Sequence, residues 1–172
     1  LAGFVSSIPF NNTKEYDDYL TRLRAVPKAF DQVIGVAKQG MADKMMPPKY
    51  LLEKVVTQIG SIEKPAGMDS VFAEPLKHFP KSVSAADQKR LHDAILAAID
   101  DDVRPAYAKL GKFVADDYAP HGRSQPGVWD LPNGDAIYRY DVEQMTTTNE
   151  TPQQIHQIGL AEVNRIEGEM TT

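Results

Sequence analysis

Residues 84–114, which read SAADQKRLHDAILAAIDDDVRPAYAKLGKFV, carry the strongest helical signal in the chain. Ser84 and Asp87 make an opening like a capping box, in which side chains bond to the backbone of the first turn. Apolar residues then recur at helical spacing along one face: they are Leu91, Ile95, Ile99, Val103, Leu110 and Val114. We expect this helix to organise the core and to bend near Val103, because Pro105 cannot donate a hydrogen bond to the carbonyl of Asp101.

The sequence before this stretch also predicts helices. Residues 11–13 can cap a long segment whose apolar residues recur at roughly helical spacing: they are Tyr16, Leu20, Leu23, Phe30, Ile34 and Ala37. Pro27 lies inside this segment, so we expect either one kinked helix or two helices. Residues 47 and 48 are prolines that suit the first turn of the next helix. In that helix Leu51, Val55 and Ile59 should face inward.

The remaining spacing completes an all-α prediction. Three prolines and a glycine between residues 61 and 82 permit only short helical pieces. Residues 119–133 are rich in proline and glycine and carry the single tryptophan, Trp129. They predict a long loop in which Trp129 plugs the end of the core or, alternatively, anchors a functional loop. No segment alternates with period two, so we expect an irregular multi-helix assembly with kinked helices and one long Pro/Gly-rich loop.

The last forty residues predict two more helices with a break between them. A helix over residues 135–148 should end at the β-branched threonines 146–148. Thr151 and Gln154 then form a T-x-x-Q capping box, with Pro152 at the first helical position. One stripe of the final helix is apolar and is still apolar where the chain stops at Thr172: it contains Ile155, Gly159, Val163, Ile166 and Met170. We therefore expect residues 1–172 to be a single helical domain and a fragment of a larger protein.

Composition excludes several classes of function. Nucleic acid is not an expected partner, because 19 basic residues face 24 acidic ones and no basic stripe is present. The absence of cysteine excludes thiolate zinc sites and a cysteine nucleophile. The four histidines are never three or four residues apart, and neither a G-x-S-x-G elbow nor a phosphate loop occurs. We expect no metal site and no cofactor in this chain, and we find no targeting signal in it.

One polar and aromatic group stands out as a candidate site. The residues that we expect to contact a substrate are Tyr138, Arg139, Tyr140, Thr147 and His156. Beside a proline-rich loop they could line a cleft, with hydrogen bonds for a peptide backbone and a guanidinium fork for a carboxylate. The simpler interpretation, which we favour, is that the tyrosines are half-buried and that the histidine is a neutral surface or packing residue near a helix N-terminus.

Several stretches of the chain together resemble one family. They are LPNGDAIYRY from residue 131, the threonine triplet at 146–148, TPQQIHQIGLAEV from 151, RIEGEM from 165, YLTRLRAVPKAFDQVI from 19, MPPKY from 46 and VRPAYAKL from 103. This ordering is similar to the bacterial "domain of unknown function 885" family. The resemblance implies long, largely helical proteins, often described as lipoproteins, whose C-terminal part resembles zinc metallopeptidases. Their His-Glu-x-x-x-Gly-His-His-like segment lies beyond the region matched here.

The resemblance sets the functional expectation. It implies that this chain is the non-catalytic helical portion of a zinc-dependent metallopeptidase-like hydrolase, helps to shape the substrate cleft, and is inactive alone. Zinc would belong to the parent protein, and the partners would be the remainder of the polypeptide and a peptide substrate. The alternative is a non-enzymatic helical interaction or scaffold module of a cell-envelope protein. We expect a location in the cell envelope or periplasm, and self-association through the exposed last helix.

Overall fold

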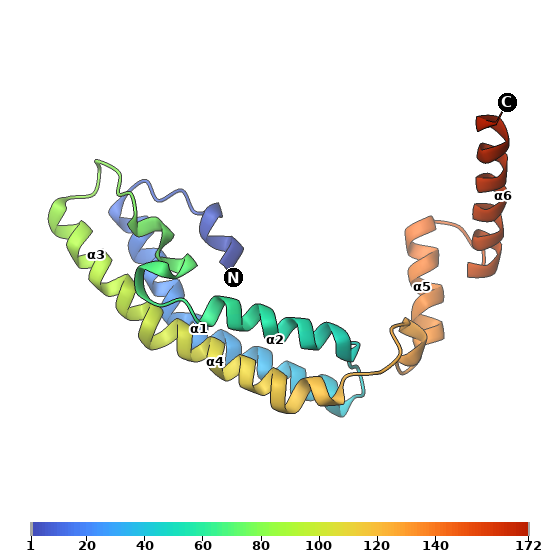
Figure 1. The fold of residues 1–172 in the computed structure, drawn as a ribbon, viewed down its shortest axis with the longest axis horizontal. Coiled ribbons are helices and arrows are strands. Elements are labelled where there is room, and N and C mark those ends of the chain that lie inside the picture. The colour runs from blue at the N-terminus through green and yellow to red at the C-terminus, as the bar shows by residue number, and fades with distance from the viewer. Residues whose placement is uncertain (1, 172) are drawn as a thin grey trace. The chain divides into compact units, whose positions relative to one another are not determined.

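Every regular element that the structure describes is a helix (Figure 1). The structure is a computed structural model, and it describes residues 2–171. Within that range the only pairing of β type is an isolated parallel bridge between Pro48 and Arg123. The all-α prediction is therefore confirmed. Where the sequence predicts a single domain, the chain divides into two compact units, an N-terminal unit (Leu1–Ser124) and a C-terminal unit (Gln125–Thr172).

The rod at the centre of the N-terminal unit is built from the stretch with the strongest helical signal. Helix α3 (Ala85–Ala98) begins after Ser84, whose side chain accepts a hydrogen bond from the Asp87 backbone as predicted. A π-helical turn, η4 (Ile99–Val103), leads into α4 (Arg104–Phe113), and a second π-helical turn follows as η5 (Val114–Tyr118). The first wide turn lies directly before Pro105, where the missing N–H and the ring disturb an α-helical ladder. The sequence thus predicts an irregularity near Val103, and in the structure this irregularity is a π-helical turn.

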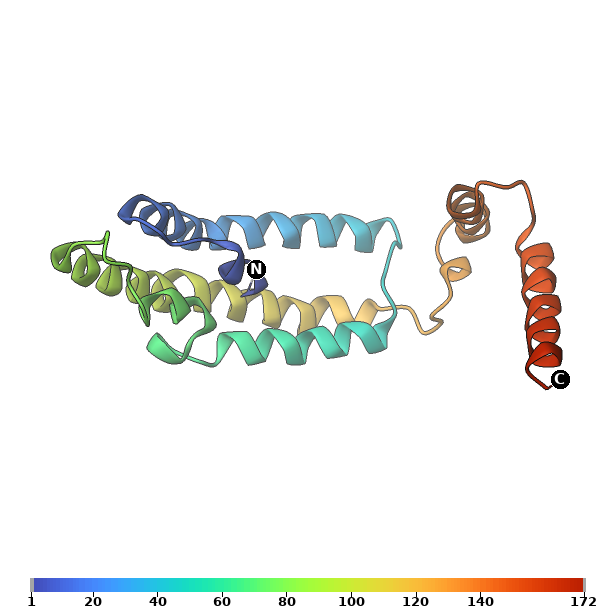
Figure 2. The same ribbon diagram turned by 90° about the horizontal axis from the view of Figure 1, so that it is seen from above.

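Two helices flank this rod. Helix α1 (Thr13–Ala42) is capped by Asn12 and continues through Pro27, so it is one element and not two. Helix α2 (Lys49–Glu63) follows Pro48 at its N-cap. Seen from above, α4 lies between α1 and α2 (Figure 2). The short 3-10 helices η1 (Ala2–Ser7), η2 (Gly67–Asp69), η3 (Val71–Leu76) and η6 (Ala119–His121) complete the unit.

The core lies where these helices meet. Five of the six predicted stripe residues of the rod are buried, and Leu110 is partly buried. One prediction on α2 is wrong: Leu51 is 41% exposed, and its neighbour Leu52 is buried instead. A helical pattern fixes only the approximate direction of a face, so adjacent leucines at its margin are not distinguished. Leu52 is the covered residue because it packs with Met46 and Ala119 in a second, smaller core cluster.

Buried tyrosines tie η3 to α1. The Tyr19 hydroxyl donates to the backbone oxygen of Phe72 at 2.8 Å, and the Tyr16 hydroxyl donates to that of Pro75 at 3.2 Å. Both side chains are almost fully buried. Burial raises the pKa of Tyr19 and of Tyr16, because a phenolate would lose its hydration.

This burial makes the N-terminal unit sensitive to alkali. The folded pKa of Tyr19 lies above its unfolded value of about 10, so its contribution is complete below about pH 10 and is lost as the pH rises further. We expect Tyr19→Phe to lower the free energy of unfolding at pH 8 by about 0.5–1.5 kcal/mol, because one hydrogen bond is lost. The same variant should lose about 1 kcal/mol less than the wild type between about pH 8 and pH 11. Urea unfolding followed by far-ultraviolet circular dichroism measures both values.

The half-exposed Tyr50 supplies the control for this comparison. Tyr50→Phe should leave both the stability at pH 8 and its alkaline decline as in the wild type. Identical pH dependence in Tyr19→Phe and the wild type would contradict the assignment.

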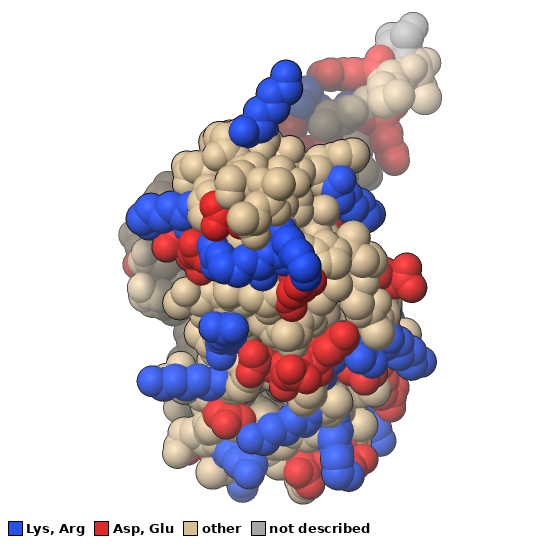
Figure 3. Space-filling view, turned by 90° about the vertical axis from the view of Figure 1, so that its left-hand side faces the viewer, with Lys and Arg blue, Asp and Glu red and all other residues tan. Residues whose placement is uncertain are grey.

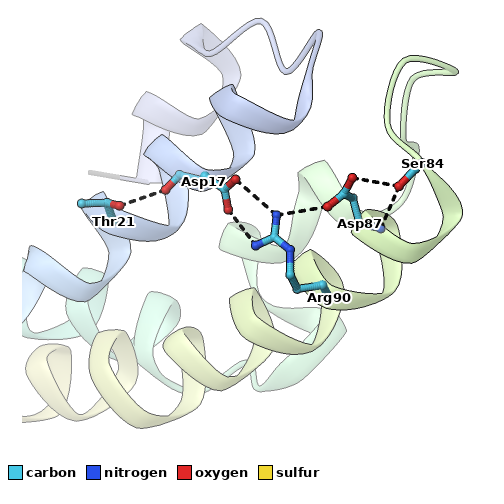
Figure 4. A network of polar contacts seen from close by, with 5 residues as sticks. All are labelled: Asp17, Thr21, Ser84, Asp87 and Arg90. Atoms are coloured by element: carbon cyan, nitrogen blue, oxygen red, sulfur yellow. Dashed lines mark hydrogen bonds and ion pairs between the residues drawn. The ribbon is translucent and has the colours of Figure 1, made fainter.

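A polar clip joins the start of α3 to α1 (Figure 4). The Arg90 guanidinium donates to both carboxylate oxygens of Asp17, at 2.8 and 3.2 Å, and lies 3.4 Å from Asp87. Arg90 and Asp17 are both about half exposed, so solvent screens the pair and it adds little to stability. On the face shown in Figure 3, basic and acidic side chains are interspersed in this manner. Because the pair adds little to stability, we assign it the role of orienting α3 against α1.

The C-terminal unit contains η7 (Val128–Asp130), α5 (Gly134–Thr146) and α6 (Pro152–Met170). The prediction that Trp129 plugs the end of the core is wrong, because this side chain is 63% exposed. Its ring instead meets the ring of Tyr138 edge-on, with 6.4 Å between centroids. Gly127 lies so close to the indole that a Cβ there would come within 2.1 Å of it. Trp129 therefore anchors the segment that leads into α5.

Candidate functional site

All five predicted site residues lie in the C-terminal unit, on α5, on α6 or between them. Helix α5 starts after Asn133, which has a φ of 57°, and Gly134 packs against the preceding turn. A Cβ on Gly134 would lie 2.2 Å from the Val128 carbonyl oxygen, so only glycine fits there. The tight entry fixes where α5 begins and therefore where its tyrosines and Arg139 emerge.

Tyr138 and Tyr140 do not line the same side of a cleft. Consecutive helical residues point about 100° apart, so Tyr138, Arg139 and Tyr140 leave α5 in different directions. Tyr138 packs against Trp129 and is 41% exposed, whereas Tyr140 is 61% exposed. The half-buried interpretation therefore describes Tyr138 better than Tyr140. A role for either residue in binding stays a prediction.

Arg139 lies at a shallow hollow between the end of α5 and the start of α6. The hollow has a volume of about 260 Å³. Its lining residues are Arg139, Glu143, Thr148, Asn149, Glu150, Thr151, Pro152 and Gln153. Of the five predicted residues, only Arg139 is among them. One guanidinium, two carboxylates and several hydroxyl and amide groups therefore surround this space, a set that can donate to and accept from a peptide backbone.

The turn beside the hollow is formed by hydrogen bonds of Thr146 and Thr147 at the end of α5. The Thr146 hydroxyl donates to the Val142 carbonyl at 2.8 Å, and Thr147 caps α5 with its backbone N–H bonded to Glu143. Thr147 has a φ of 55°, which is rare for a β-branched residue and costs of order 1–3 kcal/mol. Sequence reasoning predicts the break at the threonines but misses this strained conformation, because propensity alone does not reveal a positive φ.

The start of α6 is as predicted. The Thr151 hydroxyl accepts from the Gln154 N–H at 3.3 Å, and the Gln154 side chain accepts from the Thr151 N–H at 2.8 Å. Both halves of the capping box are therefore formed. His156 lies in the first turn of α6 and is exposed. It does not line the hollow, and neither does Thr147. As lining of the hollow, the sequence misses Glu143 and residues 149–153, and it points to Thr148 only as part of the threonine triplet.

Across residues 2–171 no three histidine, aspartate or glutamate side chains are grouped so that they could hold a metal ion. No helix described in that range is long and apolar enough to cross a membrane.

Comparisons with known proteins identify a family and find similar solved structures. The family model described as "Bacterial protein of unknown function (DUF885)" matches residues 1–172. One similar solved structure is "The crystal structure of the putative lipoprotein from Colwellia psychrerythraea", with a TM-score of 0.84 and 28% sequence identity. The match covers 95% of this chain but 28% of that one, so this chain spans little more than a quarter of the length of its relative. No curated protein matches.

Proposed function

Because this chain belongs to the bacterial DUF885 family, we propose that it forms the helical, non-catalytic wall of a substrate cleft in a larger peptidase-like hydrolase. The observation that carries this proposal is the exposure of the apolar side chains of α6. None of its residues is buried, and apart from the partly covered Ile155 its large apolar side chains are about half exposed or more: they include Ile158, Val163, Ile166 and Met170. A 19-residue helix of this kind gains most of its stability from packing. The remainder of the polypeptide would supply that packing.

The hollow between α5 and α6 would be the part of the wall that meets substrate. Arg139 offers a fork of donors for a peptide carboxylate, and Thr148 and Asn149 offer groups that pair with backbone amides. The described residues contain no metal-binding group. We therefore assign zinc and the bond-breaking step to the remainder of the parent protein and derive no step for them here.

The parent protein would act in the cell envelope. The likeness to a structure whose title names a lipoprotein supports this location. Residues 1–172 alone would be inactive towards peptides and would self-associate through the exposed face of α6.

Arg139 provides the test of the wall. In the full-length parent protein, Arg139→Gln should raise KM for peptides about tenfold or more and leave kcat within about twofold, because a charged hydrogen bond to bound substrate is lost. Arg165→Gln is the matched control, since Arg165 lies on α6 and pairs with Glu162 and Glu169 of its own helix. Peptide hydrolysis measured for both variants distinguishes them. Equal kinetics for the two variants would contradict the proposal that Arg139 lines the substrate cleft. A parent protein without peptidase activity would overturn the proposal that it is a hydrolase.

The alternative is a non-enzymatic interaction or scaffold module, and the exposed stripe of α6 also favours it. In that case the stripe would dock a separate protein of the cell envelope. The parent reading frame separates the two functions. Continuation past Thr172 into a paired-histidine zinc segment supports the hydrolase, whereas a stop codon supports the module.

A further inference from the structure

An apolar groove opens on the surface of the N-terminal unit and contains no residue of the candidate site. It lies among η1, α1 and η3 and has a volume of about 340 Å³. Its lining residues are Phe4, Val5, Tyr19, Arg22, Leu23, Val26 and Phe72. This volume falls at the lower end of the range for small-molecule sites, about 300–1,000 Å³. All of the lining except Arg22 is aliphatic or aromatic.

Local packing holds the floor of the groove rigid. Tyr19, Leu23 and Val26 are spaced along α1 so that they lie on one face. The Tyr19 hydroxyl is already engaged by the Phe72 carbonyl at 2.8 Å, so that pair closes the floor and leaves no polar group free in it. Phe4, on the opposite wall, is 40% exposed. The floor residues Tyr19, Leu23 and Val26 are each below 10% exposed, so the groove is a narrow apolar recess with Phe4 at its exposed lip.

Arg22 is the one charged residue of the groove. Its guanidinium lies over the Phe4 ring, 5.0 Å from the centroid, and within residues 2–171 it forms no ion pair with a carboxylate. The nearby carboxylates have partners of their own, since Asp18 pairs with Lys14 at 2.5 Å and Glu15 accepts from the Asn11 N–H at 2.5 Å. Arg22 is therefore a cation at the edge of the apolar groove, with N–H donors available for an anion.

We propose that this groove binds a linear acyl chain with an anionic head, such as a medium-chain fatty acid. The methylenes would lie on Leu23, Val26 and Phe72, and the carboxylate would accept hydrogen bonds from Arg22 at the rim. Guanidinium and carboxylate geometries match, and the aromatic ring beneath the guanidinium keeps it in place. Charge selects the anion, because the apolar lining alone would accept a neutral or cationic amphiphile equally well. This proposal is independent of the cleft wall, since it uses no residue of the C-terminal unit.

Titration calorimetry on residues 1–172 tests the groove with decanoate below its micelle concentration. Decanoate should bind. Octanoate, which is two methylenes shorter, should bind roughly fifteenfold more weakly, because each buried methylene changes affinity about fourfold. Decyltrimethylammonium should bind at least tenfold more weakly than decanoate. Arg22→Gln should weaken decanoate binding about tenfold or more while leaving decanol binding unchanged. Arg24→Gln is the matched control, because Arg24 is exposed two residues further along α1 and lines no part of the groove.

The space itself is tested by Val26→Phe, which should abolish binding of decanoate and decanol together. Its circular dichroism spectrum reports whether the variant folds, and the two arginine variants alter only exposed side chains. The proposal is overturned if decanoate does not bind the wild type, if the cationic amphiphile binds as tightly, or if Arg22→Gln and Arg24→Gln weaken binding equally. Occupation by an apolar peptide but not by decanoate would likewise overturn it.

Discussion

Leu91→Ala should lower the free energy of unfolding of the N-terminal unit by about 2–5 kcal/mol. Leu91 lies on α3 and is completely buried in the main core cluster, and α3 packs against α1 and η3. Truncation removes the transfer free energy of its side chain and leaves a cavity that close-packed neighbours fill only in part. Urea unfolding of the whole chain, followed by the near-ultraviolet circular dichroism of the buried tyrosines, measures the loss.

Leu51→Ala makes the same chemical change at an exposed position of α2, where 41% of the residue is accessible. It should cost below about 1 kcal/mol. If both variants lost the same free energy, Leu91 would not occupy the close-packed centre described here.

Gly122→Ala should destabilise the N-terminal unit by about 2–4 kcal/mol, although alanine tolerates the backbone of this residue, which has a φ of −57°. The added Cβ would lie 2.6 Å from the Cα of Lys49. The two segments would have to separate, and their bridge would weaken: the Lys49 N–H donates to Arg123 at 2.9 Å, and the Arg123 N–H donates to Pro47 at 3.1 Å. The cost therefore arises from a close approach of two backbones.

Gly35→Ala is the matched control, because a Cβ on Gly35 in α1 meets nothing within 4 Å. In an exposed helix interior this change should stabilise the chain by about 0.5–1 kcal/mol. Opposite signs for the two glycine variants are the expected result, measured by the same urea unfolding. A stabilising Gly122→Ala would show that the bridge to α2 is not tightly packed.

The candidate site was less accessible to sequence reasoning than the fold. Tyr138, Arg139 and Tyr140 are adjacent in the chain, and the prediction treated adjacency as proximity around one cleft. On a helix, adjacency instead separates directions, so only Arg139 lines the hollow. Trp129 illustrates the same difficulty, because composition cannot tell whether an aromatic residue finds a core or a single neighbouring ring. The groove at Arg22 went unnoticed, since its lining comes from three elements far apart in the sequence.

Four features follow from the sequence alone: the helical class, the rod with its irregularity before Pro105, the break at the threonines and the capping box at Thr151. Each depends on interactions within a few residues, where hydrogen-bonding rules and helical periodicity act directly. The burial of Leu52 in place of Leu51 and the division of the chain into two units emerge only in the folded structure. Both depend on which distant surfaces meet, and the free energy of such contacts is not encoded in any single stretch of the chain.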